Sequence, residues 1–360
     1  MTVRTPLIRT LHALREGEVR VGFLGGSITD ARPGHNWSDK IMNWLAWQYP
    51  NARFIAENAA IGATGSDSGL FRMDNDIIRR NCDLVFVEYA VNDYYVPVEQ
   101  RKKSREGLIR RLLSRSTCDV VLTYTFLQAM YPEMKAGKVP DSIAEFEELA
   151  DRYAISSVWM GLHAFEEVQR GALLWEEWLP DGLHPTHRGS LSYAQSVMRF
   201  LEQELNRSDV SNFTALPRQL PAPIEADHWE DIDFVPLDEV TTSGHWVVHR
   251  SSTIVWIDEM LVTSAVGAKL RFSFEGRGLV LGFDFGTYAS EFTYTVDNGE
   301  PVRVKRNRES WCVDEGWYRF TLLSDQWARG THRIEIEVVH GEDVNCRGTR
   351  FKLACIGVIK

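Results

Sequence analysis

The sequence predicts an α/β domain with a parallel sheet, followed by an all-β domain with an antiparallel sandwich. Between residues 18 and 206, short apolar runs alternate with stretches of helical periodicity. This alternation is typical of a parallel sheet covered by helices on both faces. From about residue 236, apolar residues recur at every second position, a pattern that indicates strands with one buried face.

Composition and charge narrow the class of protein. The chain has 360 residues, of which 44% are hydrophobic and 25% charged, and these values exclude extensive disorder and a fibrous rod. A net charge of −10 argues against nucleic acid as the main partner. No apolar run reaches the roughly 18 residues of a membrane helix, and the first residues show no signal-peptide core. The five cysteines form no C-x-x-C pair. We therefore expect reduced thiols and a cytoplasmic location.

The first region divides into alternating elements. Strands are expected at residues 19–24, 53–57, 83–89, 119–124 and 155–158, where apolar residues are consecutive. Helices are expected at residues 37–49, 67–80, 98–114, 142–153 and 186–205, where apolar residues recur with helical spacing. Because a helix separates each strand from the next, the strands are expected to run parallel.

A proline-rich stretch separates the two regions. Three prolines fall between residues 213 and 224, which predicts an extended linker. The expected domains are therefore a catalytic domain at 1–208, a linker at 209–235 and a β-sandwich at 236–360. Strands of the sandwich are expected at residues 269–274, 279–285, 291–296, 318–322 and 331–338, with a hairpin turn at 297–300.

Two loops that follow predicted strands carry candidate functional residues. Ligands of open parallel sheets bind beyond the carboxyl ends of the strands. The first strand ends in Gly25-Gly26, a flexible pair that can present Ser27 as a nucleophile, although a phosphate cradle or a plain turn has the same pattern. The third strand is followed by Asn92, whose side-chain amide can donate to an oxyanion or close an Asx turn.

The loop before the last predicted helix holds a second candidate pair. Asp181 precedes His184 by three residues, and a turn between them can bring the carboxylate onto the imidazole. Such a carboxylate orients a histidine that acts as a general base. The alternatives are an ordinary surface histidine and a metal site formed by Asp181, His184 and His187. The metal site would leave Ser27 and Asn92 without a role, so no metal and no other cofactor is expected.

Together these segments resemble the four motif blocks of the SGNH (GDSL-type) hydrolase family. The blocks are Gly25-Gly26-Ser27, the segment 58–62, the segment 91–93 and the segment 181–185. They occur in the family's order, each in the expected position relative to the predicted strands and the last helix. The resemblance covers residues 18–206.

This resemblance implies a three-layer α/β/α, flavodoxin-like fold and a serine ester hydrolase. Ser27 would be the nucleophile, His184 the general base and then acid, and Asp181 the residue that orients it. The oxyanion hole would comprise the backbone N–H of Ser27, the Asn92 side chain and a backbone N–H at Gly62, with Ala63 as the alternative. The family's usual Gly-Asp-Ser is Gly-Gly-Ser here.

The second domain is rich in aromatic residues and resembles the jelly-roll and carbohydrate-binding modules found beside esterases. Its tryptophans are Trp246, Trp256, Trp311, Trp317 and Trp327. They can stack on sugar rings or simply fill a sandwich core.

The main hypothesis is a carbohydrate esterase that removes acetyl groups from an acetylated oligosaccharide. One alternative is a lipase-like or thioesterase-like acyl hydrolase, or an acyltransferase, acting on substrates other than sugars. The other is a non-catalytic glycan-binding protein. The expected partner is a small acylated substrate, with no nucleic acid and no membrane, and a homo-oligomer is left open.

Overall fold

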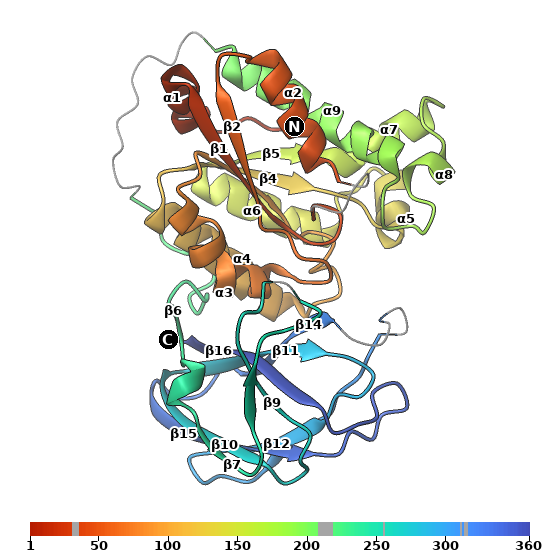
Figure 1. Cartoon of the computed structure of the whole chain (residues 1–360). Helices are drawn as coiled ribbons and strands as arrows, with labels where there is room; N and C mark the ends of the chain where they lie inside the picture. Colours follow the sequence, from red (N-terminus) through yellow and green to blue (C-terminus); the bar gives the residue numbers. More distant parts are fainter. Residues whose placement is uncertain (31–35, 208–218, 255, 310–311, 313–315) are drawn as a thin grey trace. The chain divides into compact units, whose positions relative to one another are not determined.

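The chain forms two compact units, Met1–Glu230 and Asp231–Lys360 (Figure 1). The computed structural model describes residues 1–30, 36–207, 219–254, 256–309, 312 and 316–360. Within these residues, no helix is long and apolar enough to cross a membrane.

The first unit is built on a parallel sheet, as the sequence predicts, and the strand order is β2-β1-β3-β4-β5. Its strands are β1 (Glu18–Gly25), β2 (Arg53–Asn58), β3 (Leu84–Glu88), β4 (Asp119–Tyr124) and β5 (Ser156–Trp159). Strands β3 and β4 are buried along their whole length, which explains why they read as continuous apolar runs.

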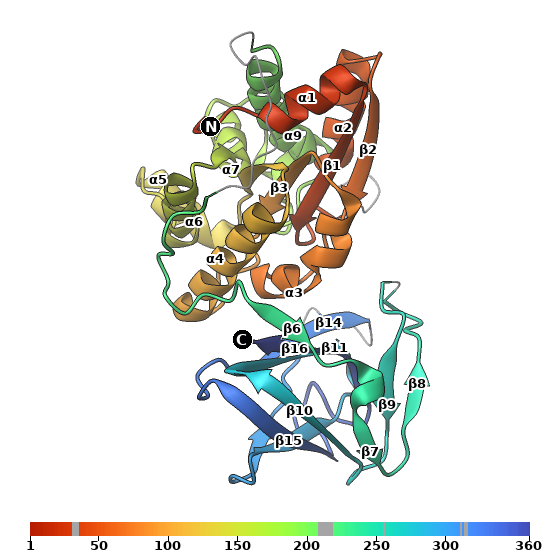
Figure 2. The ribbon, with the colours of Figure 1, turned by 90° about the vertical axis from the view of Figure 1, so that its left-hand side faces the viewer.

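Helices cover both faces of this sheet. They are α1 (Ile8–Glu16), α2 (Ser38–Gln48), α3 (Ser66–Asp76), α4 (Val98–Arg115), α5 (Tyr131–Lys135), α6 (Asp141–Tyr153), α7 (Met160–Gln169), α8 (Trp175–Trp178) and α9 (His187–Leu205), with 3₁₀ turns η1 (Ile78–Arg80) and η2 (Gln128–Met130). Helices α2, α7 and α9 pack together on one face, and α3, α4 and α6 pack together on the other (Figures 1 and 2). The predicted three-layer α/β/α fold is confirmed.

The helices differ from the sequence prediction in five places: the helix expected at 67–80 is shorter, and α1, α5, α7 and α8 were not predicted. The helix expected at 67–80 ends at Asp76, because the backbone of Ile77 leaves the helical conformation and its side chain is buried. The chain then continues into η1. Helix α7 was not predicted, because it follows β5 without any turn residues. Its Gly161 lies so close to the carbonyl of Thr125 that a Cβ would be only 2.8 Å from that oxygen.

The segment 219–230, within the predicted linker, packs along α4. In this segment the structure shows neither helix nor strand. Trp229 is fully buried and its N–H donates to the carbonyl of Lys103, while the carboxylate of Glu106 accepts the N–H groups of Ile224 and Glu225. Residues 208–218 lie outside the described residues. The limits of the two domains and the linker stay a prediction.

The second unit contains two antiparallel sheets, which confirms the predicted β-rich fold. One sheet has the order β13-β12-β15-β10-β7, and the other has the order β14-β11-β16-β9-β8 with β6 also paired to β16. The bounds are β6 (Ile232–Phe234), β7 (Thr241–Ser243), β8 (Val247–His249), β9 (Met260–Thr263), β10 (Lys269–Gly276), β11 (Gly278–Phe285), β12 (Glu291–Val296), β13 (Val302–Val304), β14 (Trp317–Ser324), β15 (Gly330–Val339) and β16 (Phe351–Ile359), with the 3₁₀ turn η3 (Leu237–Glu239).

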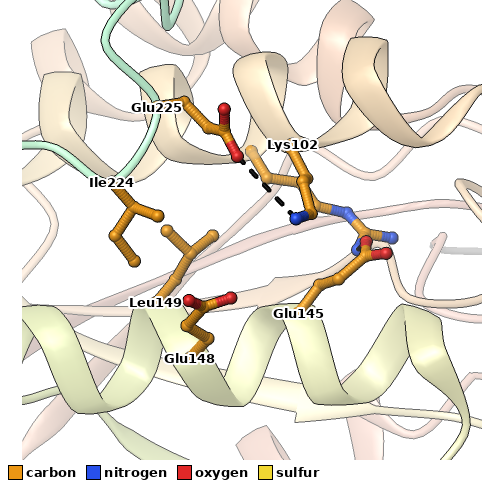
Figure 3. Close-up of a pocket in the computed structure, with 7 residues that line it drawn as sticks. Lys102, Glu145, Glu148, Leu149, Ile224 and Glu225 are labelled. Atoms are coloured by element: carbon orange, nitrogen blue, oxygen red, sulfur yellow. Dashed lines mark hydrogen bonds and ion pairs between the residues drawn. The ribbon is translucent and has the colours of Figure 1, made fainter.

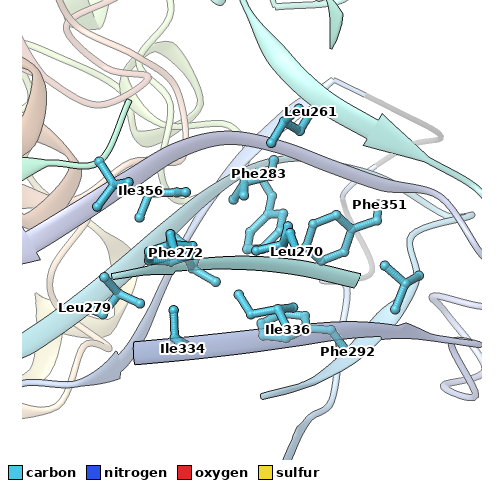
Figure 4. Packing of buried hydrophobic residues seen from close by; sticks show 14 of the residues in the cluster. Leu261, Leu270, Phe272, Leu279, Phe283, Phe292, Ile334, Ile336, Phe351 and Ile356 are labelled. Carbon is cyan, nitrogen blue, oxygen red and sulfur yellow. The ribbon is translucent and has the colours of Figure 1, made fainter. Parts of the chain in front are cut away.

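The core of the second unit lies between these sheets. Phe283 and Phe351 come from one sheet, and Leu270, Phe292 and Ile336 come from the other (Figure 4). Along β10, buried and less buried residues alternate, which is the period of two seen in the sequence.

The hairpin predicted at 297–300 joins β12 to β13. Asp297 and Asn298 both have positive φ, as the tight turn between paired antiparallel strands requires. Strand β16 was not predicted. Opposite Gly282 and Phe283 of β11, β16 contains the extra residue Ala354, and this bulge disturbs the alternation that would have indicated the strand.

Candidate active site

The candidate site lies at the carboxyl ends of β1 and β3. The strand order reverses between these two neighbours, because β2 lies on the other side of β1. The chain leaves β1 for α2 on one face of the sheet and leaves β3 for α4 on the other. In open α/β sheets, such a reversal opens a crevice beyond the strand ends.

The turn after β1 needs its two glycines because neighbouring groups approach closely. A Cβ on Gly26 would lie 2.0 Å from Oδ1 of Asn92, and a Cβ on Gly25 would lie 2.9 Å from the side chain of Thr29. The turn is closed by N–H groups of Thr29 and Asp30, which donate to the carbonyl of Gly26. Ser27 is thereby presented beside the Asn92 side chain.

Ser27, His184 and Asp181 form a continuous chain of hydrogen bonds. The hydroxyl of Ser27 lies 2.8 Å from Nε2 of His184, and Nδ1 of His184 lies 2.8 Å from Oδ2 of Asp181. A carboxylate only accepts hydrogen bonds, so Nδ1 carries the proton and Nε2 is free to accept the serine proton. The side chains of His184 and Asp181 are about half exposed, so solvent and substrate can reach them.

The carboxylate of Asp181 is held in its charged form. Its Oδ1 accepts the backbone N–H groups of Leu183 and His184 at 2.9 and 2.7 Å. Partial burial acts to raise the pKa of Asp181, but the hydrogen bonds from His184 and from these N–H groups outweigh it and lower the pKa. Asp181 therefore stays ionised at neutral pH, as a residue that orients an imidazole must.

A neighbouring loop that sequence reasoning missed supports the Asp181 turn. Gly182 has φ +79°, and a Cβ there would lie 2.6 Å from Oε1 of Gln128. The backbone N–H of Gln128 donates to the carbonyl of Gly182 at 2.8 Å. Beyond the turn, Thr186 caps α9 by accepting two N–H groups of its first turn. No sequence motif marks Gln128, because its role depends on the packing of two distant loops.

Several N–H groups around Ser27 are available to an incoming ligand. Within the described residues, the backbone N–H groups of Ser27, Gly62 and Ala63 donate to no protein acceptor, and the Asn92 side chain makes no hydrogen bond. The turn at 62–64 is attached to β1, since the N–H of Ile61 donates to the carbonyl of Gly25 at 3.0 Å. The left-handed conformation in this turn falls on Ala63, with φ +61°.

A buried carboxyl group lies under the Ser27 turn. Glu88 ends β3, is fully buried, and accepts the hydroxyl groups of Thr29 at 3.1 Å and Thr125 at 2.8 Å. Trp37 in turn donates its indole N–H to Thr29. Burial raises the pKa of Glu88 to about 7 despite these hydrogen bonds. The Ser27 turn is thus connected by hydrogen bonds to the end of β3, to the segment after β4 and to the start of α2.

The structure does not assemble the metal-ligand set that the spacing of Asp181, His184 and His187 suggested. Nδ1 of His187 lies 3.4 Å from the ammonium group of Lys40. Across the described ranges, no cluster of three or more His, Cys, Asp or Glu side chains is arranged to hold a metal ion.

The aromatic residues of the second unit differ in exposure. Trp246, Trp317 and Trp327 are partly buried and pack against the sandwich core. Trp256 is 46% exposed and packs edge-on against Tyr318. Trp311 lies outside the described residues. Packing accounts for three of the five tryptophans, and glycan binding by this unit stays a prediction.

Residues 23–190 match the sequence profile of the GDSL-like Lipase/Acylhydrolase family. The matched segment runs from β1 into the first turn of α9 and contains Ser27, Asn92, Asp181 and His184. A comparison with curated proteins found no match.

The fold is similar to that of a two-domain esterase (CEX) active on acetylated mannans. Its crystal structure has a TM-score of 0.83 at 22% identity, covering 99% of this chain and 96% of that chain. The structure co-crystallised with mannopentaose has a TM-score of 0.81 at 22% identity, covering 99% and 95%. Axe2, an acetylxylan esterase from Geobacillus stearothermophilus, covers 53% of this chain and 97% of its own at 20% identity and a TM-score of 0.43. The likeness to CEX shows that the chain shares the fold of that two-domain protein, with an α/β unit followed by a β-rich unit.

Proposed function

We propose that this chain is a serine ester hydrolase that removes acetyl groups from oligosaccharides, because residues 23–190 match the profile of the GDSL-like Lipase/Acylhydrolase family. Ser27 is the nucleophile, His184 the general base and acid, and Asp181 the residue that orients His184. The observation that carries this proposal is the unbroken Ser27–His184–Asp181 hydrogen-bond chain, whose serine lies just beyond the carboxyl end of β1.

The proposed reaction has two halves. The hydroxyl oxygen of Ser27 attacks the ester carbonyl carbon while Nε2 of His184 takes its proton, and the same nitrogen then protonates the leaving sugar oxygen. A water molecule, deprotonated by His184, attacks the resulting acetyl-serine and releases acetate. Asp181 stabilises the imidazolium that forms in each half, without taking its proton.

Negative charge that develops on the carbonyl oxygen needs preorganised donors. The backbone N–H of Ser27, the backbone N–H of Gly62 or Ala63, and the Asn92 side-chain amide supply them in this proposal. All surround the Ser27 turn and none is used by another protein group in the described residues. Loss of one such donor lowers kcat by about 100- to 1000-fold in comparable sites.

Two observations support an acetylated oligosaccharide as the substrate. The fold of both units resembles that of an esterase active on acetylated mannans. The second unit also exposes Trp256 and contains further aromatic side chains that suit sugar rings. A cytoplasmic location, which would favour short imported oligosaccharides over intact polymers, is part of the same proposal. Fractionation of cells that make the protein tests the location.

The decisive experiment compares the wild type with Ser27→Ala on p-nitrophenyl acetate and on acetylated manno- and xylo-oligosaccharides, each with and without a metal chelator. We expect the wild type to cleave the acetyl esters in both conditions and Ser27→Ala to lose at least about 10⁴-fold in kcat. Retained activity in Ser27→Ala, or loss of wild-type activity with the chelator, contradicts the serine mechanism.

A panel of p-nitrophenyl esters of increasing acyl length tests the substrate class separately. Preference for acetate supports the deacetylase, whereas preference for octanoate indicates a lipase-like acyl hydrolase. Binding of oligosaccharides without hydrolysis of any ester on the panel would indicate a glycan-binding protein instead.

A further inference from the structure

Asp93, the neighbour of Asn92, is a buried carboxylate with two separate attachments. It is 1% exposed and lies just beyond the end of β3. Its Oδ1 accepts the backbone N–H of Ser66 at 2.9 Å, and its Oδ2 accepts Nε of Arg105 at 2.8 Å. Bonds between a buried carboxylate and such donors are short and strong, so they restrict movement of the groups they join.

The first attachment leads to the turn at 62–64. Ser66 begins α3 and follows that turn by two residues. The close packing is visible at Gly65, where a Cβ would lie 2.5 Å from Oδ1 of Asp93. The turn at 62–64 is therefore held at one end by β1, through Ile61 and Gly25, and at the other end by Asp93.

The second attachment leads to α6. Arg105 is fully buried, and its guanidinium donates to the carbonyl and the hydroxyl of Ser142 and to the carboxylate of Glu145. The hydroxyl of Ser142 donates back to the carbonyl of Ala90 at the end of β3. This arrangement fixes the carboxylate of Asp93 relative to two elements beside its own loop.

Glu145 extends the network to the residues that follow Asp93. Its carboxylate also pairs with Arg101, at 2.6 and 2.7 Å, and Arg101 donates to the carbonyls of Tyr94 and Val96. Figure 3 shows Glu145 on α6 with its carboxylate directed towards α4, at a small cavity also bordered by Lys102 and Glu225. The loop after β3 is thus held at Ala90, Asp93, Tyr94 and Val96.

Sheet topology explains why such an attachment is needed. Asn92 follows β3 and the 62–64 turn follows β2, while β1, which carries Ser27, lies between these two strands. Strands β2 and β3 are therefore about 10 Å apart, too far for direct backbone pairing. No ladder hydrogen bond between β2 and β3 sets the separation of the two loops, whereas the Asp93 carboxylate joins them directly.

We propose that Asp93 is a positioning residue that holds the Asn92 amide and the backbone N–H groups of the 62–64 turn at the separation one oxyanion requires. The inference rests on the proposed function, because it assigns a role only if these groups receive the carbonyl oxygen. A misplaced donor raises the activation free energy of the chemical step more than it weakens substrate binding, so it lowers kcat more than it raises KM.

Three variants test this role, each assayed with p-nitrophenyl acetate well below its unfolding temperature. Asp93→Asn removes the charge, and Gly65→Ala pushes on the Asp93 carboxylate while leaving every charge in place. The matched control is Asp74→Asn, because Asp74 on α3 forms a comparable carboxylate–guanidinium pair with Arg111 on α4, at 2.7 and 2.8 Å. This control removes an ion pair between α3 and α4 and leaves the residues of the loops after β2 and β3 unchanged.

For Asp93→Asn and Gly65→Ala we expect kcat to fall about 10- to 100-fold with KM changed less than about twofold. Asp74→Asn is expected to lower only the unfolding midpoint. A kcat for both test variants within about twofold of the control overturns the inference, and if Asp93→Asn does not fold, Gly65→Ala decides alone. Ser27→Ala distinguishes failure of the proposed function from failure of the positioning role. Full activity of Ser27→Ala refutes the proposed function. If Ser27→Ala is inactive but the Asp93 and Gly65 variants keep their kcat, only the positioning role is refuted.

Discussion

Each unit of the protein contains an Asp–His pair of nearly the same geometry, and the two pairs differ in their third partner. In the α/β unit, Asp181 accepts Nδ1 of His184 at 2.8 Å, and Nε2 of His184 faces the hydroxyl of Ser27. In the β unit, Asp297 lies 2.6 Å from Nδ1 of His332, and Nε2 faces the carbonyl of Ala328 at 2.7 Å. Each carboxylate also accepts a nearby backbone N–H.

The third partner decides what the histidine can do. A carbonyl oxygen only accepts hydrogen bonds, so both ring nitrogens of His332 are favoured in the protonated form. Burial acts to lower the pKa of His332, but hydrogen bonds to Asp297 and Ala328 outweigh it and raise the pKa. His184 instead faces a hydroxyl group that can give up its proton. An Asp–His pair is therefore a structural charge pair in one unit and a candidate base in the other.

The largest expected effect comes from removing the carboxylate of each pair in turn. Asp181→Asn preserves the shape of the turn but favours the wrong tautomer of His184, so we expect kcat/KM on p-nitrophenyl acetate to fall by about 10⁴-fold. The matched variant Asp297→Asn is expected to leave kcat/KM within about twofold of the wild type. Equal losses in the two variants would show that the pairs are not functionally different.

A smaller effect is expected from the turn that carries the catalytic pair. Gly182 has φ +79° and contacts Gln128, so in Gly182→Ala the turn shifts to relieve the strain and the contact. We expect kcat/KM to fall about tenfold, since small displacements of catalytic groups are costly.

The control for this variant is Gly171→Ala. Gly171 has φ +72° but nothing lies within 4 Å of the added Cβ. It carries the same backbone strain, about 1–2 kcal/mol, away from the site. Similar kinetics for the two variants would mean that the Gly182 turn does not position Asp181 and His184.

The smallest effect is a pH dependence of stability that belongs to the β unit. The pKa of His332 is raised in the folded state from its ordinary value of 6.5. The stabilisation of the fold by the His332–Asp297 pair is therefore fully present below pH 6.5, and it is lost as the pH rises through the folded-state pKa. As the pH rises above 6.5, we expect the unfolding midpoint of the β unit to decrease by more in the wild type than in His332→Asn. Identical slopes in thermal denaturation would contradict the assignment of this charge pair.

The sequence was most informative where a residue's role depends on its own loop. The apolar runs of β1 and β3 located the strand ends, and the spacing of Asp181 and His184 placed both side chains on one turn. It was least informative where partners come from distant segments. Gln128 and the Arg105–Glu145 network carry no motif, since their importance depends on which loops the sheet order brings together. Strand β16 was missed because its extra residue Ala354 breaks the period of two.

By itself, the sequence determined the order of elements, the parallel and antiparallel halves, and the loops that hold Ser27, Asn92, Asp181 and His184. These follow from local periodicity and turn chemistry, which depend on residues close together in the chain. Only the tertiary structure decided that Ser27 and His184, 157 positions apart, lie within hydrogen-bond distance, and that Asp93 joins the turns after two strands that are not neighbours. Such distances are set by how the strands are ordered and how side chains pack between layers, and no local pattern records either.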